Sequence, residues 1–506
     1  MPDDYKERID KDGSIVVYDE DEANKLAEKF RSDSTIRVNR TENKYIFYRI
    51  DAITKPMSIT DLVRTLETTI KYDYANKIIT FLAMITAYTE ESQFNLSFRA
   101  PSSTGKSYTP LELSTYFPSE DVIKIAYSSP TSFYHDSGEW DKDRKLLIVN
   151  LEKKILIFLD QPHDQLLQRL RALLSHDQKE LLYKITDKRE KSGTRTKNVI
   201  IRGFPSVIFC TGSLKIDEQE ATRNIILSPE ISKEKIREGI ELKALKKGNP
   251  IVFKEHVEKN LERDILIERI KLIKEAQIKY IIIKNHESVA RRFLDKYPKT
   301  KARHQRDIER IISLICGLAL LNLWHRDRDD QGNIYASEQD INDAFELFDR
   351  IADSQELGIA PYVHNVFKQV IKPLYDERNK NTEPKLGLER RVIAAKYFEV
   401  FNKAISDKML KYDILNALEQ AGLVYLEDDP KDKRQTLVYV TTPPQKDIYS
   451  SSNAGLEKYI HSQGGVNKQE NAICENCTKY TICYLSNGRY FCKDCIGNYP
   501  QNTLTG

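Results

Sequence analysis

Residues 99–108, RAPSSTGKSY, contain a glycine, a lysine and a hydroxyl residue in direct succession, Gly105, Lys106 and Ser107. Glycine lets backbone N–H groups turn toward a phosphate, lysine neutralises phosphate charge, and a hydroxyl can reach a Mg²⁺ ion. An apolar, strand-like run precedes the stretch and a helix-forming segment follows it, which is the context in which such loops bind phosphate. The alternative is a polar turn that matches by chance. We predict a phosphate-binding loop made of Ser102, Ser103, Thr104, Gly105, Lys106 and Ser107.

Two further apolar runs end in polar residues. KKILIFLDQP (153–162) ends in Asp160, and GFPSVIFCTGS (203–213) ends in Thr211. A carboxylate at the tip of a neighbouring parallel strand can hold Mg²⁺ opposite the hydroxyl of the loop. A buried strand with an arbitrary acid at its end would account for one element but poorly for the loop and the acid together. The sequence therefore predicts that ATP is bound with Mg²⁺, which Ser107 and Asp160 would hold.

The chain is long enough for several domains, at 506 residues. Short apolar runs alternate with helical segments between residues 94 and 228, which predicts an α/β fold with a parallel sheet covered on both faces. A highly charged helical region follows it. The predicted segments are an α+β start (1–70), a nucleotide-binding core (71–230), a helical lid (231–355), linker helices with a winged helix (356–442), a linker (443–470) and a zinc ribbon (471–506).

Charged residues make up 31% of the chain, and the net charge is only +3. This composition indicates a soluble protein whose surface for nucleic acid, if it has one, is local rather than global. The charged start MPDDYKERIDKDG has no apolar stretch of an export signal. We expect an intracellular protein, cytoplasmic or nucleoid-associated, with no membrane partner.

Five of the seven cysteines lie in CENCTKYTICYLSNGRYFCKDC (474–495). Two C-x-x-C pairs can direct four thiolates at one ion in the tetrahedral geometry of structural Zn²⁺. Cys483 is the extra thiol, while Cys210 and Cys316 are isolated in apolar surroundings and are expected to be small buried side chains. The predicted zinc ligands are Cys474, Cys477, Cys492 and Cys495.

Two segments combine basic residues with a geometry suited to DNA. The stretch 183–203 is typical of a β-hairpin with a basic turn, and its alternative is an ordinary solvated loop. The stretch 385–441 is typical of a winged helix, a unit that binds DNA or docks to proteins. Basic side chains in both would contact phosphates. The candidates are Lys188, Arg189, Lys191, Arg195 and Lys197 in the hairpin, and Lys408, Lys411, Lys431, Lys433 and Arg434 in the winged helix.

The order of loop, acid and polar strand end resembles the AAA+ ATPases, above all the minichromosome maintenance (MCM) helicases and the helicase-like initiators of mobile elements. The stretches KARHQRDIERIISLICGLALL (301–321) and YASEQDINDAFELFDRI (335–351) are similar to the lid of those helicases. The resemblance covers roughly residues 75–350. It implies that Thr211 senses the terminal phosphate and that Arg303 takes the place of the second sensor.

The same resemblance implies that Arg223 acts as an arginine finger across a subunit boundary, although it could equally be a surface arginine. It further implies that the basic hairpin projects into the channel of a homo-oligomeric ring, such as a hexamer, on DNA. On this basis we expect an ATPase that is a DNA helicase, a translocase or a replication initiator.

Two features depart from the family pattern. Gln161 follows Asp160 where hydrolytic members place a glutamate, and a glutamine cannot accept a proton from the attacking water. Asp164 or another acid would then have to serve as base. The segment from Thr211 to Arg223 is also shorter than in replicative helicases. An ATP-gated DNA-binding switch or loader with weak hydrolysis is therefore the alternative, and a zinc-containing scaffold with a vestigial ATPase is a third, opposed by the intact loop and Asp160.

Overall fold

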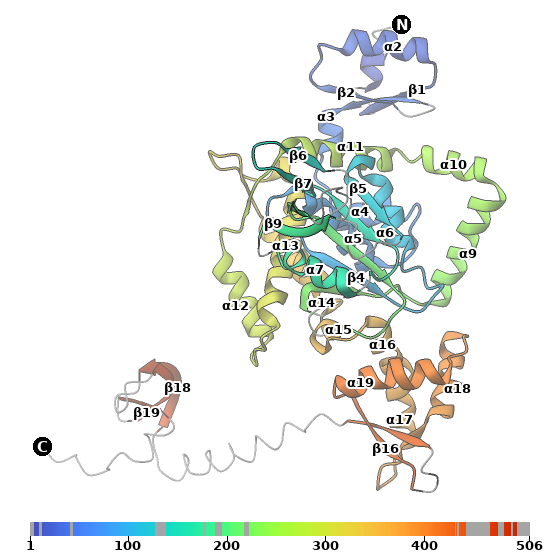
Figure 1. The fold of residues 1–506 in the computed structure, drawn as a ribbon, viewed down its shortest axis with the longest axis vertical. Helices are drawn as coiled ribbons and strands as arrows, with labels where there is room; N and C mark the ends of the chain where they lie inside the picture. Colours follow the sequence, from blue (N-terminus) through green and yellow to red (C-terminus); the bar gives the residue numbers. More distant parts are fainter. Residues whose placement is uncertain are drawn as a thin grey trace, which may run out of the picture. The chain divides into compact units, whose positions relative to one another are not determined.

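The structure is a computed structural model, and it divides the chain into two compact units, Met1–Val440 and Thr441–Gly506, each described here by itself (Figure 1). The residues that it describes are 5–9, 13–40, 44–126, 138–162, 164–176, 178–187, 195–216, 222–430, 432, 435–441, 466–473, 480–486 and 489–492.

A five-stranded parallel sheet forms the centre of the first unit, in the order β12-β4-β11-β8-β5. Four of its strands, β4, β8, β11 and β12, are buried along their whole length, as expected for a parallel sheet with both faces covered, whereas the edge strand β5 is partly exposed. β11 lies between β4 and β8, so the strand before the phosphate loop is not the neighbour of the strand that ends near Asp160. The strands are β4 (Asn95–Arg99), β5 (Val122–Ile125), β8 (Ile155–Phe158), β11 (Ser206–Thr211) and β12 (Asn224–Leu227).

Side chains of the sheet alternate between two apolar clusters, because successive residues of a strand point to opposite faces. On β11, Val207 and Phe209 pack with α7, whereas Ile208 and Cys210 belong to the cluster that includes α5 and α13. Gly317 lets α13 approach α5, since a Cβ there would lie 3.2 Å from Leu82. The helices near the sheet are α5 (Tyr74–Ile85), η1 (Thr86–Tyr88), α6 (Tyr108–Leu113), η2 (Ser114–Tyr116), η3 (Ser119–Asp121), α7 (Asp164–Leu174) and α13 (His304–Leu321).

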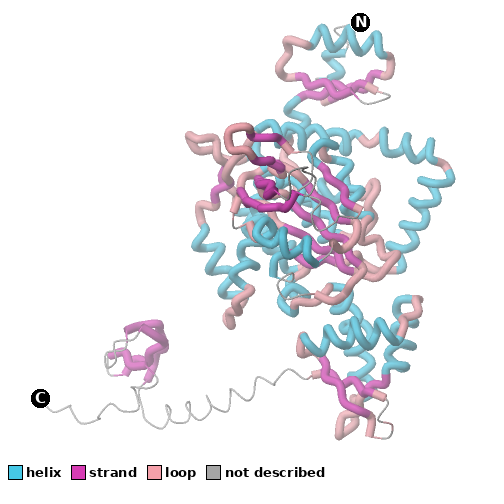
Figure 2. The backbone as a smooth tube through the Cα atoms, viewed as in Figure 1, coloured by secondary structure: helices cyan, strands magenta, loops and turns pink. Residues whose placement is uncertain are grey.

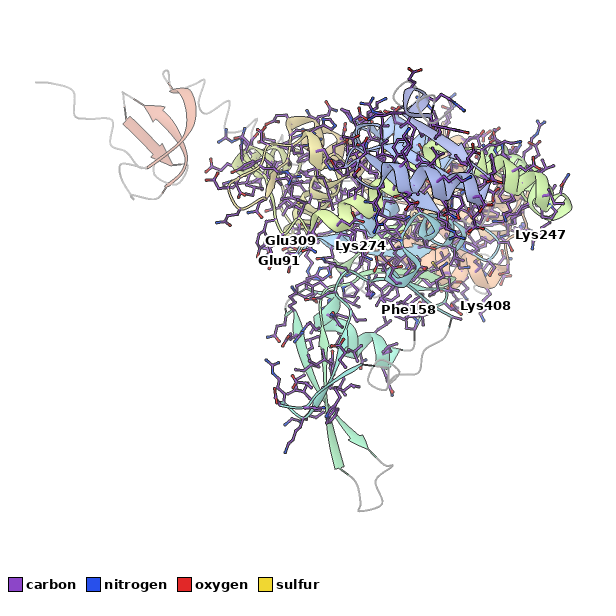
Figure 3. All side chains as sticks on the ribbon, turned by 90° about the horizontal axis from the view of Figure 1, so that it is seen from above. Glu91, Phe158, Lys247, Lys274, Glu309 and Lys408 are labelled. Atoms are coloured by element: carbon purple, nitrogen blue, oxygen red, sulfur yellow. The ribbon has the colours of Figure 1, made fainter. Side chains whose placement is uncertain are left out.

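A second sheet, of order β6-β7-β10-β9, is built from two insertions into the core. One insertion lies between β5 and β8, and the other is the hairpin of β9 and β10 before β11. β10 pairs in parallel with β7, which joins the two insertions. Figure 3 shows this part of the chain, in teal and green, extending from the body of the unit. The strands are β6 (Glu139–Asp141), β7 (Leu146–Asn150), β9 (Glu180–Asp187) and β10 (Arg195–Arg202).

The N-terminal residues form a small antiparallel sheet of order β1-β3-β2. One face packs on α2, and Ile46 and Tyr48 on the other face pack against α11. A buried ion pair of 2.6 Å between Lys44 and Asp264 holds the same contact. The elements are β1 (Ser14–Val17), α2 (Glu20–Phe30), β2 (Ile36–Arg40), β3 (Tyr45–Arg49), α3 (Ile50–Thr54) and α4 (Ile59–Leu66).

The region after β12 is helical, as predicted. α9, which begins after the Ser232 cap, has no buried residue, and this agrees with the exposed helix expected from its charges. α14 begins with a capping box of Ser337 and Asp340. The elements are α9 (Lys233–Gly248), α10 (Pro250–Glu258), α11 (Leu261–Ala276), β13 (Ile281–Ile282), α12 (His286–Lys296), η5 (Leu323–His325), β14 (Ile334–Tyr335), α14 (Glu338–Asp349) and α15 (Ala352–Leu357).

The last part of the first unit has its own apolar cluster and a three-stranded antiparallel sheet of order β15-β17-β16 (Figure 2). The winged helix stays a prediction for this region. Its elements are α16 (Pro361–Val366), η6 (Phe367–Ile371), α17 (Lys372–Arg378), β15 (Leu388–Glu389), α18 (Arg390–Phe401), η7 (Met409–Leu415), α19 (Asn416–Gln420), β16 (Val424–Asp428) and β17 (Thr436–Val440).

The second unit contains a small antiparallel sheet of β18 (Val466–Ile473), β19 (Tyr480–Ser486) and β20 (Arg489–Cys492). Cys492 ends β20 and lies opposite Cys483 of β19. Cys474, Cys477 and Cys495 lie outside the described residues, so the zinc site stays a prediction. Across the described parts of the chain, no helix is long and apolar enough to cross a membrane. The predicted α/β class with a helix-flanked parallel sheet is confirmed.

Candidate nucleotide-binding site

The predicted phosphate loop follows β4 and leads directly into α6. Gly105 has φ +90° and Ser103 has φ +68°, so the backbone turns through the left-handed region twice. A Cβ on Gly105 would meet no atom within 4 Å. Glycine is therefore favoured here by its backbone conformation rather than by lack of space. Ser102 and Ser103 are exposed, whereas Lys106 and Ser107 are half-buried.

The loop rests against the end of β11 through Ser107. The buried Cys210 thiol lies beside the Ser107 hydroxyl and the Lys106 ammonium group. Burial raises the pKa of Cys210 to about 12, and the hydrogen bond with Ser107 and the charge of Lys106 oppose that rise. Cys210 is thus a buried side chain, as predicted from its apolar surroundings, and it supports the loop from below.

The ends of β8 and β11 bring the other predicted residues together. Phe158 is paired with Phe209, so Asp160 and Thr211 occupy equivalent positions two residues further along adjacent strands. The Thr211 hydroxyl donates to Gln161 Oε1 at 2.9 Å, and the Ser213 backbone N–H donates to Thr211 Oγ1 at 3.1 Å. Asp160 is exposed, and its Oδ1 accepts the backbone N–H of Gln161 at 2.8 Å.

The oxygen donors at this edge suit a magnesium ion. Ser107 offers a hydroxyl and Asp160 a carboxylate, both from positions at the carboxyl edge of the sheet. Mg²⁺ takes oxygen ligands and commonly uses one or two protein groups together with nucleotide phosphates. The exposed carboxylate of Asp160 and the hydroxyl of Ser107 fit this requirement.

Arg99, at the end of β4, is a structural residue of the site that sequence reasoning missed. Its side chain is only 2% exposed. It donates from Nε to Ser97 Oγ at 3.1 Å, and from Nη1 to the backbone carbonyls of Ser213 and Lys215. These contacts fix the segment after Thr211 against the loop strand. The signal in the sequence was an arginine at the end of a strand-like run, directly before the phosphate loop.

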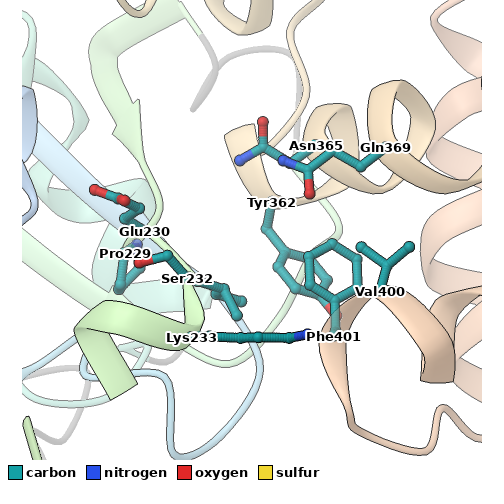
Figure 4. Close-up of a pocket in the computed structure, with 10 residues that line it drawn as sticks. Pro229, Glu230, Ser232, Lys233, Tyr362, Asn365, Gln369, Val400 and Phe401 are labelled. Atoms are coloured by element: carbon teal, nitrogen blue, oxygen red, sulfur yellow. The ribbon is translucent and has the colours of Figure 1, made fainter. Parts of the chain in front are cut away.

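The carbonyl of Arg99 also connects the loop strand to the C-terminal helices. It accepts the Ser228 hydroxyl at 2.6 Å, and Ser228 Oγ in turn accepts the backbone N–H of Tyr362 in α16 at 3.0 Å. A cavity of about 290 Å³ lies beside this junction, with Asn365 and Gln369 from the α16 and η6 helices among its lining residues (Figure 4).

Arg223, the candidate arginine finger, lies at the opposite edge of the sheet from the loop. It immediately precedes β12, and Asn224 is level with Asn95 at the start of β4, whereas the loop follows the end of β4. The Arg223 Nε donates to Ser175 Oγ at 2.9 Å. β12 spans about 13 Å at the usual rise per residue. Arg223 and Lys106 therefore lie at opposite ends of the strands, about one strand length apart.

Arg303, the candidate second sensor, starts α13 and is held by Asp307. Its Nε donates to Asp307 Oδ2 at 3.0 Å, while Arg310 Nη1 donates to Asp307 Oδ1 at 2.6 Å. Arg310 also donates to the carbonyl of Asn224, next to Arg223. Burial lowers the pKa of Arg310 to about 10, which leaves it charged near neutral pH. Arg303 is thus linked, through Asp307 and Arg310, to the backbone next to Arg223.

His304, Asp307 and Glu356 form a cluster that could be mistaken for a metal site. His304 Nδ1 accepts the Lys301 backbone N–H at 3.1 Å, so the proton lies on Nε2, 2.9 Å from Glu356. Asp307 is already occupied by two guanidinium groups. A cation would face these arginines, and the donor set does not fit a metal.

The structure describes only some of the candidate DNA-binding residues. Lys188, Arg189, Lys191, Lys431, Lys433 and Arg434 lie outside the described residues. Arg195 and Lys197 are positions of β10 in the predicted hairpin, whose two strands pair as expected. Lys408 is exposed, and the Lys411 ammonium group lies 5.0 Å from the centre of the Tyr412 ring.

Comparisons with known proteins find no family profile and no curated protein that match the chain. Similar solved structures include a full-length MCM homolog from Methanopyrus kandleri, with 10% identity over 67% of this chain and 63% of that chain, and a TM-score of 0.37. A putative ATPase from Cytophaga hutchinsonii gives 11% identity, coverage of 62% and 93%, and a TM-score of 0.31. The SCCmec type IV Cch helicase is 12% identical over 82% of this chain and 82% of that chain, with a TM-score of 0.30.

Scores below 0.5 are too low for any function to be transferred, and the match spans less than two thirds of the Methanopyrus protein. The class of the core follows instead from its own topology. A phosphate loop follows β4, an acid follows β8, and β11 with its terminal Thr211 is inserted between these two strands. This helix-flanked parallel sheet, with a strand inserted between the loop strand and the acid strand, is consistent with an AAA+ core.

Proposed function

We propose that this chain is an ATP-hydrolysing AAA+ protein that works on DNA as a homo-oligomeric ring, as a helicase, a translocase or a replication initiator. The observation that carries the proposal is the division of the machinery between two edges of one sheet. Lys106, Asp160 and Thr211 lie at the carboxyl edge, and Arg223 lies at the amino edge.

The carboxyl edge would bind the nucleotide. Backbone N–H groups around Gly105 would surround the phosphates, and Lys106 would neutralise their charge. Ser107 and Asp160 would hold Mg²⁺, which supplies further neutralisation of the phosphates when it is bound. Gln161 and Thr211, from the ends of adjacent strands, would form the part of the site that meets the terminal phosphate.

The amino edge would contribute Arg223 to the nucleotide site of a neighbouring copy. Arg223 cannot reach its own loop across the length of β12, but a head-to-tail arrangement of copies brings one edge to face the other. Arg303 is linked to the same edge through Asp307 and Arg310. An arginine that stabilises charge on the transferred phosphoryl group from a neighbour would make hydrolysis depend on the assembly.

The hairpin of β9 and β10 is the element proposed to contact DNA. It precedes β11 directly in the sequence, so its base lies at the amino end of β11, the end opposite to Thr211. Its basic residues would contact the sugar-phosphate backbone without reading bases. The resemblance of this arrangement to the MCM helicases, in which such a hairpin enters the channel of the ring, supports this role.

The C-terminal region would add DNA-binding modules. The order helix, strand, two helices and two strands between α16 and β17 is that of a winged helix, with Lys408 and Lys411 near its third helix. A zinc ribbon would follow in the second unit. We place the protein in the cytoplasm or at the nucleoid, without a membrane partner.

An ATP-gated switch or loader is the second candidate, and one contact favours it. Gln161 stands where a general base would be expected and is engaged by Thr211. A protein with this arrangement would assemble on duplex DNA when ATP is bound and would hydrolyse it slowly.

The first test is ATP turnover of the purified chain with and without single-stranded DNA. We expect DNA to increase turnover severalfold and the increase to require Lys106, because the lysine neutralises phosphate charge. Lys243→Ala, at an exposed position of α9, is the matched control and should behave as wild type. Strand separation with the same Lys106 dependence would identify a motor. DNA-dependent turnover that survives Lys106→Ala would contradict both candidates.

Zinc content provides a separate prediction. Purified chain should contain about one zinc per molecule, and Cys474→Ser should remove it, because a closed site of four thiolates needs every ligand. Cys483→Ser is the matched control and should retain the metal. Atomic absorption measures both variants, and equal zinc loss in the two would contradict the proposed ligand set.

A further inference from the structure

The contact between Thr211 and Gln161 fixes which end of the Gln161 amide is free. Thr211 is 2% exposed, so its hydroxyl has little access to solvent. Its oxygen already accepts the Ser213 N–H at 3.1 Å, and Gln161 Oε1 lies 2.9 Å away. Because a buried hydroxyl that does not donate is costly, the proton goes to Gln161 Oε1. The opposite amide orientation would leave this proton without an acceptor among the contacts that the structure describes.

The Gln161 Nε2 amino group takes no part in the contact with Thr211. It carries two hydrogen-bond donors and no acceptor. Nucleotide phosphate oxygens only accept hydrogen bonds, so this group is complementary to a terminal phosphate. It is poorly suited to a water nucleophile, because it would donate to the lone pair of the water rather than take its proton. The hydroxyl of Thr211 is meanwhile committed to Gln161 instead of the phosphate.

We infer that Thr211 is a positioning residue that acts through Gln161: it turns the Gln161 amino group toward the terminal phosphate, so that the site discriminates ATP from ADP and retains ATP. The inference rests on the proposed function, since it assumes that the carboxyl edge binds ATP. It specifies something that the proposal leaves open, namely that Thr211 contributes to γ-phosphate recognition indirectly and that the two residues form a single unit.

The pair of Thr211 and Gln161 predicts a specific pattern of nucleotide affinities. ADP lacks the γ-phosphate, so the affinity for ADP should not depend on either side chain. Loss of the Gln161 amino group should weaken binding of ATP by about tenfold or more, the effect of one hydrogen bond to a charged group. Loss of the Thr211 hydroxyl should have a similar effect, because the amide is then free to turn.

The experiment measures equilibrium binding of ADP and of a non-hydrolysable ATP analogue, with Mg²⁺, to the full chain. The variants are Gln161→Ala, Thr211→Val and the double variant, with Thr211→Ser as the change that keeps the hydroxyl. Gln168→Ala, at an exposed position of α7, is the matched control. We expect both single variants to lose analogue affinity selectively, the double variant to lose no more than Gln161→Ala, and Thr211→Ser to bind as wild type.

Other outcomes overturn the inference in distinguishable ways. Additive losses in the double variant would mean that Thr211 and Gln161 act independently. A parallel loss of ADP affinity in Gln161→Ala, at a half-exposed site that tolerates truncation, would mean that Gln161 only supports the local structure. Wild type that binds neither nucleotide would overturn the proposed function and this inference together.

Discussion

An equimolar mixture of Lys106→Ala and Arg223→Ala chains is expected to hydrolyse ATP although neither variant does so alone. Each variant keeps the edge that the other has lost, because Lys106 and Arg223 lie at opposite ends of the strands. An arginine finger is typically worth about 10³–10⁵ in rate, so each variant alone should fall to background. In randomly mixed rings about a quarter of the boundaries join an intact loop to an intact arginine.

The measurement is steady-state ATP turnover in the presence of DNA, with the total protein concentration held constant. Arg237→Ala removes an exposed arginine of α9 and should leave turnover unchanged in every combination. A mixture that stays at background would show that Arg223 does not act between copies. Full activity of Arg223→Ala alone would make it a surface arginine, the alternative that its sequence left open.

Gln161→Glu is expected to increase ATP turnover by at least about tenfold. Thr211 would donate to one carboxylate oxygen, and the other oxygen would be free to accept a proton from the attacking water. General-base catalysis is typically worth about 10²–10⁴ in rate. Repulsion between the new carboxylate and the terminal phosphate would offset part of this gain. Single-turnover kinetics with ATP measures this step apart from product release.

Gln168→Glu places the same charge on an exposed position of α7 and should leave the rate unchanged. Rapid turnover by wild type with no gain in Gln161→Glu would mean that another acid, such as Asp164, already serves as base. In that case the chain would be a motor rather than a protein set to hold ATP.

The phosphate loop and its sheet could be predicted because their signals are local. Gly105, Lys106 and Ser107 are adjacent in sequence, and the strands are short apolar runs whose alternation the structure reproduces in two clusters. The long apolar run IISLICGLALLNLW (311–324) is likewise a local signal, and it forms most of the buried part of α13 together with η5.

Contacts between distant residues could not be predicted in the same way. The pairing of β7 with β10 joins two insertions, and nothing in either segment alone indicates its partner. The role of Asp307 could not be predicted, because only the folded chain brings its carboxylate between Arg303 and Arg310. The contact between Gln161 and Thr211 depends on the neighbouring positions of β8 and β11, which are set by the order of the whole sheet.

The hydroxyl of Ser228 has a mechanical consequence. It is a single pivot between the carbonyl of Arg99, at the base of the phosphate loop, and the first turn of α16, and all three residues are buried. Close-packed interiors yield little under load, so strain is passed on rather than absorbed. The Ser228 hydroxyl therefore couples the position of the loop strand to that of the first turn of α16.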